Sequence, residues 1–397
     1  MQTLQKNILR FNFLVVLLSI KERLYKIMVL KVYSATIVSG GTSYFDIKKL
    51  LDGISPQCVC GVVCSGVDAE LEYHEHLTLL KSIIYELLGR QVPVTLIPQY
   101  LLPQGGVSID IYTLEGCSGV SISKSRGICY GSVCDDEEAL LFIEGIPASD
   151  FARSVRWQSW EVFSKLDSIL SAHGFAVDDI VRQWNYIGDI VGQREGKQNY
   201  QEFNDARTIY YRGGAWQSGY PAATGIGASG MGVIVGCIAF KSSKNSIYPI
   251  DNPLQVAAHI YSDKVLIDNA VDAMKSTPKF ERAKVIVTNR GACCFVSGTA
   301  AIRGEQSVDA ESVTMQTIRT IENIAHLVSP ENLARYGCAP YELEYAQLQV
   351  FIKRAEDYEQ VKTVVEQAFP KLRVLYTVAD VCRSELLVEI EGILISQ

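Results

Sequence analysis

The order of expected helices and strands repeats along this 397-residue chain. In the last third, strand-like "CCFVSGTAAIRG" leads to helix-like "AESVTMQTIRTIENIAHLV", and strand, helix, strand and strand follow. The middle third has a similar order, offset by roughly 150 residues, and the N-terminal third is a fainter version. Such a repeat predicts three α+β units, each with helices on one face of a sheet, in one compact pseudo-threefold body.

The repeat also predicts where the units begin and end. We expect a degenerate N-terminal unit at 28–145, a middle unit at 146–280 and a C-terminal unit at 281–397. In the middle unit, residues 154–174 should form an amphipathic helix. Its apolar residues at helical spacing should face the sheet: Trp160, Phe163 and Leu170.

Composition favours an ordinary globular protein, because 48% of residues are hydrophobic, 20% are charged and the net charge is −7. No basic block indicates nucleic-acid binding. The 11 cysteines, an odd number, suggest reduced thiols in a cytoplasmic protein. The run "CVCGVVC" at 58–64 lacks a second pair at zinc spacing, so we expect a buried strand and no metal.

The N-terminal 27 residues imitate a signal peptide, since Lys6 and Arg10 precede a short apolar run. No small-residue cleavage site follows, and the run is too short to span a membrane. We therefore treat 1–27 as an extension of doubtful status, with either Met1 or Met28 as the start, and expect no membrane association.

The last strand, "LLVEIEGILIS", carries two glutamates in an apolar run. Alternation places Glu389 and Glu391 on one face, about 7 Å apart. One interpretation is a half-buried strand with a wet face. The other is a pocket in which like charges raise one pKa and create a general acid. Aligning the middle unit's "VIVGCIAFK" puts Gly236 opposite Glu389 and Ile238 opposite Glu391, so that copy has no acid.

The segment 199–230 combines arginines, tyrosines and a glycine-punctuated loop. Its "GIGASG" matches a dinucleotide fingerprint, but the strand-like "MGVIVGCIAF" follows where a helix is needed, which argues against NAD binding. Arginines bind carboxylates bidentately, and tyrosines offer a hydroxyl beside an apolar ring. The candidate substrate-binding residues here are Arg207, Tyr211, Arg212, Tyr220 and Thr224.

The motifs "YQEFNDARTIYYRG…GYPAATGIGASG", "FVSGTAAIRGE" and "VCRSELLVEIEG" together resemble the chorismatases, in which one chain looks like a fused trimer of the Rid (YjgF-like) type. The resemblance covers roughly residues 150 to 397. It implies an α+β fold of tandem Rid-like, or chorismate-mutase-like, units with helices packed on mixed sheets. It also implies a small-molecule substrate, no cofactor, and a monomer or loose homo-oligomer.

The resemblance further implies an activity and site residues. Chorismatases release the enolpyruvyl side chain of chorismate as pyruvate, and the first glutamate of "EIE", here Glu389, protonates the side-chain methylene. A carboxyl partly desolvated beside Glu391 could do this. Cations are needed for the substrate's two carboxylates. The first candidates for this role are Arg207 and Arg383, and the second candidates are Arg212 and Arg303.

Two positions point to a product. The family's 3-hydroxybenzoate-forming branch carries Gly in "SGTA" and Cys seven residues before the catalytic glutamate, whereas the hydrolytic branch has Ala at both. Gly298 and Cys382 resemble the former, although Cys382 can equally be a small buried residue. The chain departs from the family's "SI-x-GH" at Ala301 and "RGE" (303–305), which could alter substrate placement.

Two other functions stay open. A Rid-like deaminase of 2-imino or enamine acids would use a similar carboxylate–arginine pocket. A non-catalytic protein would use the pocket only to bind a small metabolite or a partner. The fused chain and the single acidic copy favour a chorismate-processing enzyme.

Overall fold

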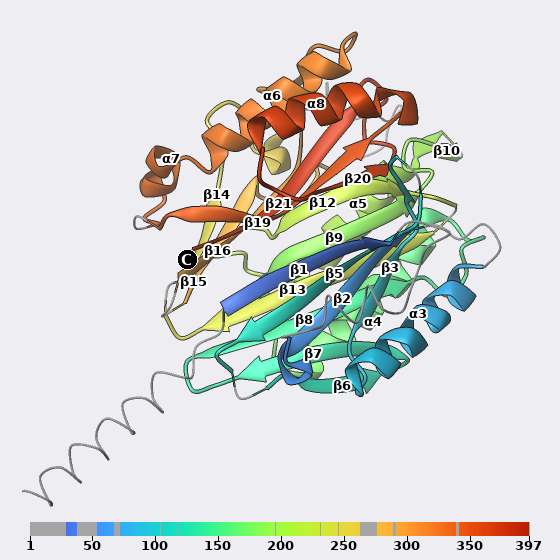
Figure 1. Ribbon diagram of the computed structural model, residues 1–397, viewed down its shortest axis with the longest axis vertical. Helices are drawn as coiled ribbons and strands as arrows, with labels where there is room; N and C mark the ends of the chain where they lie inside the picture. The colour runs from blue at the N-terminus through green and yellow to red at the C-terminus, as the bar shows by residue number, and fades with distance from the viewer. Residues whose placement is uncertain are drawn as a thin grey trace, which may run out of the picture.

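The computed structural model describes residues 29–37, 54–66, 72–103, 105–117, 119–194, 196–230, 232–244, 246–262, 276–288, 291–338 and 341–396. Within these ranges the chain forms three large sheets, of four, six and seven strands. Figure 1 shows the helices on the outside and the sheets toward the middle. The fold is α+β with mixed parallel and antiparallel sheets, as the sequence predicts. The predicted extension at 1–27 lies outside the described residues.

Each large sheet contains the same four-strand arrangement. Numbered along the chain, the strands lie side by side in the order first, fourth, second and third. The second and third are parallel and the other neighbours are antiparallel. In sheet order, the strands are β1 (Val29–Ile37), β5 (Val107–Glu115), β2 (Val59–Gly66) and β3 (Val94–Ile97); β8 (Glu138–Pro147), β13 (Val233–Ser242), β9 (Ile180–Gly188) and β12 (Ala222–Ala228); and β16 (Gly291–Ala300), β21 (Val388–Ser396), β19 (Leu343–Ile352) and β20 (Val374–Val378).

Further strands widen two of the sheets. The second sheet adds β6 (Ser121–Ser125) and β7 (Ile128–Cys134), and the third adds β4 (Tyr100–Leu101), β14 (Ile247–Ile250) and β15 (Ala283–Thr288). Short hairpins are made by β10 (Gln193–Arg194) with β11 (Lys197–Gln198) and by β17 (Ile302–Arg303) with β18 (Gln306–Ser307). Residues 121–145, which the expected boundary between 145 and 146 assigns to the first unit, include β6, β7 and most of β8 and pair within the middle sheet.

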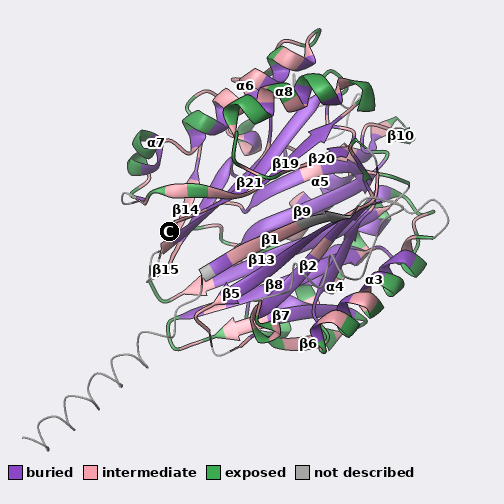
Figure 2. Cartoon of the chain, viewed as in Figure 1, coloured by how far each residue is buried: buried purple, intermediate pink, exposed green. Residues whose placement is uncertain are grey.

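Helices connect the parallel strands and cover the outer faces of the sheets (Figure 1). They are α3 (Tyr73–Leu88), α4 (Val155–Ala172), α5 (Asn199–Tyr210), α6 (Val313–Leu327), α7 (Pro330–Arg335) and α8 (Tyr358–Ala368). Figure 2 shows that the strands are largely buried, while the helices leave one side exposed. No helix among the described residues is both long and apolar enough to cross a membrane.

One prediction about α4 is wrong. Phe163 and Leu170 are buried as expected, but Trp160 is 52% exposed. The small Ser159 is fully buried and takes the inward position beside it. Trp160 instead lies on the outer flank, where Arg156 stacks over its ring. Helical spacing alone did not distinguish the centre of the apolar face from its edge.

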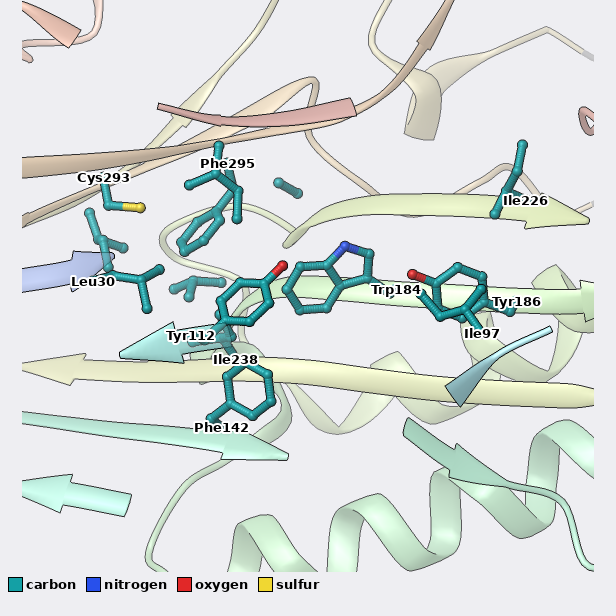
Figure 3. Packing of buried hydrophobic residues seen from close by; sticks show 14 of the residues in the cluster. Leu30, Ile97, Tyr112, Phe142, Trp184, Tyr186, Ile226, Ile238, Cys293 and Phe295 are labelled. Atoms are coloured by element: carbon teal, nitrogen blue, oxygen red, sulfur yellow. The ribbon is translucent and has the colours of Figure 1, made fainter. Parts of the chain in front are cut away.

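The three sheets meet in a shared hydrophobic core. Its side chains come from strands of every unit, and Figure 3 shows Tyr112, Phe142, Trp184 and Phe295 packed together. Tyr112 contacts Phe142 with ring centroids 5.3 Å apart and lies edge-on to Trp184 at 6.3 Å. Because this core is common to all units, they form one body. We call the contact zone between two neighbouring sheets a seam, and residues far apart in the sequence become neighbours there.

Candidate active site

The terminal strand β21 lies inside its sheet, hydrogen-bonded on both sides. Glu389 pairs with Ala300 of β16 and with Phe351 of β19. Glu389 and Glu391 are only 5% and 6% exposed. The interpretation of this strand face as a wet surface is therefore wrong, and both carboxyl groups are held in the interior.

Glu389 lines a cavity at the seam between the second and third units. Gln198, helix α5 and strand β12 form one side of the cavity, and Tyr261 together with residues from Pro278 onward form the rest. The lining residues are Gln198, Tyr200, Gln201, Asn204, Ala223, Gly225, Tyr261, Pro278, Phe280, Arg282, Gly298, Ala300, Ile302, Cys382, Arg383, Leu386 and Glu389.

The Glu389 carboxyl occupies space that Gly298 leaves open. A Cβ built at Gly298 would overlap the Glu389 carboxyl oxygen, so even alanine would force a shift there. Burial raises the pKa of Glu389 to about 8, and the negative charge of Glu391 acts in the same direction against Arg182 and Arg282. The carboxyl is therefore mostly protonated at neutral pH, as a general acid requires.

Glu391 lies behind Glu389 rather than on the cavity wall. Its carboxylate accepts hydrogen bonds from Arg182 Nη2 at 2.7 Å and from Trp184 Nε1 at 3.1 Å. Arg182 is 1% exposed and also donates to Thr224 Oγ1 at 2.8 Å. A buried pair with this many hydrogen bonds holds Glu391 in one position as a fixed charge behind Glu389.

Thr224 joins this pair to the cavity. Its Oγ1 accepts a hydrogen bond from the Gly298 amide at 3.0 Å. Thr224 lies within β12, and its carbonyl accepts from Asn185 Nδ2 at 2.9 Å. Thr224 therefore connects the second and third units beside Glu389.

The seam between the first and second units repeats this arrangement without an acid. There Thr95 Oγ1 accepts from the Gly145 amide at 2.7 Å. A Cβ built at Gly145 would meet Ile234, just as one at its counterpart would meet Glu389. Ile234 therefore stands in the place of Glu389, and this second seam has no carboxyl at the corresponding position.

The alignment predicted from the sequence is displaced by two residues. Gly236 corresponds to Glu391 and not to Glu389, because each strand pairs with its neighbour around a bulge. In the middle sheet the register shifts between Val235 and Cys237 of β13, and the extra residue lies opposite them in β8, between Ile143 and Ile146. Two apolar strands give no sequence landmark for this bulge, so the pattern alone could not determine the register.

The predicted arginines fall into three groups. Arg383 lines the cavity. Arg207 is 1% exposed and does not line the cavity; its Nη2 donates to Oδ1 of the lining residue Asn204 at 2.6 Å. Arg212 is exposed at the end of α5, and Arg303 bonds Glu322 at 2.7 Å on α6. Arg212 and Arg303 are therefore not brought to the cavity.

The two predicted tyrosines form an aromatic cluster next to the cavity. Tyr211 and Tyr220 stack with centroids 5.9 Å apart, and Trp216 contacts both rings. Tyr211 donates to Gln183 Oε1 at 2.8 Å. The loop before β12 is held by Lys284, whose Nζ donates to three carbonyls in 218–220. Neither tyrosine is among the lining residues, so the cluster supports the wall from behind.

Cys382 lines the cavity as a protonated thiol. Burial, with the nearby Glu389 charge, raises the pKa of Cys382 to about 12. A thiol of this kind is a poor nucleophile, so Cys382 contributes shape and low polarity rather than covalent chemistry. Its backbone carbonyl accepts from Gln198 Nε2 at 3.4 Å.

Sequence reasoning missed two buried arginines, Arg182 and Arg282. Arg182 stands in the middle of an otherwise buried strand, "IVRQWNYIG". A charge there signals a buried partner, because unpaired charges are rarely tolerated in strand interiors. Arg282 precedes β15 with no comparable signal. In the described residues, no group of three His, Cys, Asp or Glu side chains could hold a metal ion.

Comparisons with known proteins show which family this chain is similar to. The family model described as "Chorismatase FkbO/Hyg5-like, N-terminal" matches residues 119–239. A 3-hydroxybenzoate synthase from Streptomyces hygroscopicus is 32% identical over 228 residues, which are 55% of this chain and 64% of that protein. A chorismatase from Streptomyces rapamycinicus is 30% identical over 243 residues, which are 58% of this chain and 68% of that protein.

A solved structure extends the comparison to the whole fold. The crystal structure of a chorismatase superposes with a TM-score of 0.69 and covers 93% of this chain and 99% of that one, at 22% identity. The predicted α+β fold class is thereby confirmed, including for the N-terminal third, which the sequence matched only in outline.

Proposed function

This chain belongs to the chorismatase family, and from that premise we propose that it converts chorismate into pyruvate and a hydroxybenzoate, with 3-hydroxybenzoate as the favoured product. The observation that carries the proposal is a buried carboxyl that is protonated at neutral pH and lines a cavity together with buried cations. An enol ether is opened by protonation at carbon, which needs such an acid.

Glu389 is the proposed acid. Its proton is transferred to the methylene carbon of the enolpyruvyl group, which leaves a positive charge on the adjoining carbon and oxygen. The oxygen of the neighbouring ring hydroxyl then attacks the ring carbon that bears the side chain. The bond from that carbon to the ether oxygen breaks, its electrons complete the ketone of pyruvate, and the hydroxyl proton returns to the Glu389 carboxylate.

The epoxide that results opens as the ring loses a proton, which is transferred to the oxygen, and the aromatic 3-hydroxybenzoate is formed. Pyruvate and hydroxybenzoate together contain the atoms of chorismate, so no water is consumed. The Glu391 charge behind Glu389 stabilises the protonated form of the acid before the transfer.

Gly298 and Cys382 support the hydroxybenzoate branch. Both line the cavity beside Glu389, and the absent side chain at Gly298 leaves room for the carboxyl. The low polarity of the Cys382 thiol favours exclusion of water from that corner. A hydrolytic enzyme would instead need a water molecule within reach of the developing cation.

The proposal is tested by incubating the purified chain with chorismate and separating the products. We expect pyruvate and 3-hydroxybenzoate in equal amounts. Pyruvate with a dihydroxylated cyclohexadiene acid would support the family but refute the product. Absence of pyruvate would refute the activity. Release of ammonia from an added 2-imino acid, measured in a parallel assay, would favour the deaminase.

The pH dependence of turnover is a separate prediction. Because Glu389 acts protonated and its pKa is about 8, we expect kcat/KM to be level at neutral pH and to fall tenfold per unit above about 8. In Glu391→Gln the like charge that raises the pKa of Glu389 is removed, so the fall should begin at a lower pH. The measurement is a pH–rate profile of both proteins. An unchanged alkaline limb in the variant would contradict the role given to Glu391.

A further inference from the structure

We propose that the seam between the first and second units holds a second binding site, one that takes an aromatic α-amino acid. This site is separate from the Glu389 cavity, and its occupancy does not depend on the proposed reaction. Three features of one cavity support it: a place in the repeat that matches the catalytic cavity, an aromatic wall, and two opposite charges on the lining.

The cavity at this seam is the counterpart of the Glu389 cavity. Its volume is about 550 Å³, within the range of small-molecule sites. Ile234, which stands in the place of Glu389, is part of its lining. Tyr73 at the start of α3 lines it from the first unit, as Tyr200 at the start of α5 lines the catalytic cavity from the second. The repeat thus provides a second cavity that has an apolar side chain at the position of the acid.

One wall of this second cavity is aromatic. A Cβ built at Gly232 would meet the Phe151 ring at 2.9 Å, so the absent side chain lets that ring lie directly against the backbone before β13. Tyr73 and His74 also contact Phe151, with ring centroids 5.5 and 5.7 Å away. The ring is therefore fixed in place, and it lines the cavity together with Tyr73 and Ile234. Such a surface suits a flat apolar ring of a ligand.

Two exposed side chains of opposite charge complete the lining, one from each unit. Glu72 immediately precedes α3 in the first unit, and Arg194 belongs to the β10–β11 hairpin in the second. Among the described residues, neither side chain has a hydrogen-bond or ion-pair partner. Both charges are therefore available to a ligand that enters between the two units.

The combination of charges selects the class of ligand. A simple aromatic carboxylate would find Arg194 but would be repelled by Glu72, and an aromatic amine would meet the reverse. An aromatic amino acid carries a carboxylate for Arg194, an ammonium group for Glu72 and a ring for Phe151. These three groups branch from one short skeleton, which fits a cavity of this size. The bound amino acid would contact both units across the seam.

The test uses three probes that share one ring. They are L-phenylalanine, 3-phenylpropanoate, which lacks the ammonium group, and 2-phenylethylamine, which lacks the carboxylate. Titration calorimetry at neutral pH and low salt measures their affinities. We expect L-phenylalanine to bind the wild-type chain and each analogue to bind at least about tenfold more weakly, because it loses one charge-assisted contact. L-Phenylalanine should also raise the melting temperature, since it binds the folded chain.

Two single variants assign the charges. Arg194→Met should weaken L-phenylalanine about tenfold while changing 2-phenylethylamine by less than about twofold. Glu72→Gln should weaken L-phenylalanine similarly and leave 3-phenylpropanoate no weaker. Both residues are exposed, so the variants should fold, which circular dichroism and thermal melting verify. Arg212→Met, at an exposed arginine outside the lining, is the matched control and should bind all three probes as the wild type does.

Several results would overturn the proposal: no binding of L-phenylalanine, equal affinity of the wild-type chain for the three probes, or wild-type affinity for L-phenylalanine in Arg194→Met. Loss of L-phenylalanine binding in Arg383→Met, with Arg194→Met unaffected, would also overturn it, because the amino acid would then occupy the Glu389 cavity. Binding is measured without chorismate. Failure of the proposed function therefore appears separately, as absent turnover of chorismate by the wild-type protein.

Discussion

Glu389→Gln is expected to lower kcat for pyruvate release by about 10²–10⁴-fold while leaving KM and thermal stability nearly unchanged. Glutamine has the size of glutamic acid and fits the space beside Gly298, but it cannot transfer a proton to carbon. Since Glu389 is protonated at neutral pH, the substitution removes no charge there, and substrate binding should persist. The measurement is steady-state kinetics with chorismate at neutral pH.

Glu385→Gln is the control for this experiment. Glu385 is an exposed carboxylate four residues earlier on the same segment, and it accepts a hydrogen bond from Ser307 Oγ at 2.7 Å. Its change to glutamine should alter kcat by less than about twofold, because exposed substitutions are usually small in effect. A Glu389→Gln protein with wild-type kcat would exclude Glu389 as the acid.

Arg182→Met should destabilise the protein by about 3–5 kcal/mol. The change leaves the buried Glu391 carboxyl without its arginine, with Trp184 Nε1 as the remaining hydrogen-bond donor among the described residues, and it removes the guanidinium that lies 4.8 Å over the Trp184 ring. Urea unfolding at neutral pH measures the effect. Because Thr224 also loses its arginine, we expect the seam between the second and third units to loosen.

Two further variants separate burial from charge. Lys244→Met breaks a surface pair in which both side chains are about half exposed, and it should cost less than about 1 kcal/mol. The double variant Arg182→Met with Glu391→Leu should regain much of the lost stability, because no unpaired charge remains inside. If Arg182→Met were as mild as Lys244→Met, the buried pair would not hold the seam.

The repeat and the fold class could be predicted because they rest on local signals. Helical and strand periodicity in each third is visible without knowledge of neighbours, and the family motifs extend it. The register of Glu389 against the middle unit was missed for a different reason. It depends on bulges in two apolar strands, which pattern does not reveal. The prediction that Trp160 faces the sheet was wrong for a similar reason, since the small Ser159 occupies the buried position next to it.

The site was only partly accessible from sequence. Glu389 was recognisable because acids are rare in an apolar strand. Arg383, Gly298 and Cys382 were recognisable because they belong to the motifs that resemble the family, and all four residues line the cavity. Arg212 and Arg303 have the right chemistry, yet they contact solvent and α6. The important missing residue, Arg282, lies about a hundred residues before Glu389, and only folding of the third sheet makes them neighbours.

The Thr–Gly seam that occurs beside Ile234 and again beside Glu389 has a consequence for how this molecule can change. In an assembly of three identical chains, one substitution changes all three seams, so a catalytic acid would be present and buried at each of them. Joined in a single polypeptide, each seam accumulates its own substitutions. The desolvation penalty of a buried carboxyl can then be confined to the seam where Glu389 stands, while Ile234 leaves its counterpart free to serve stability.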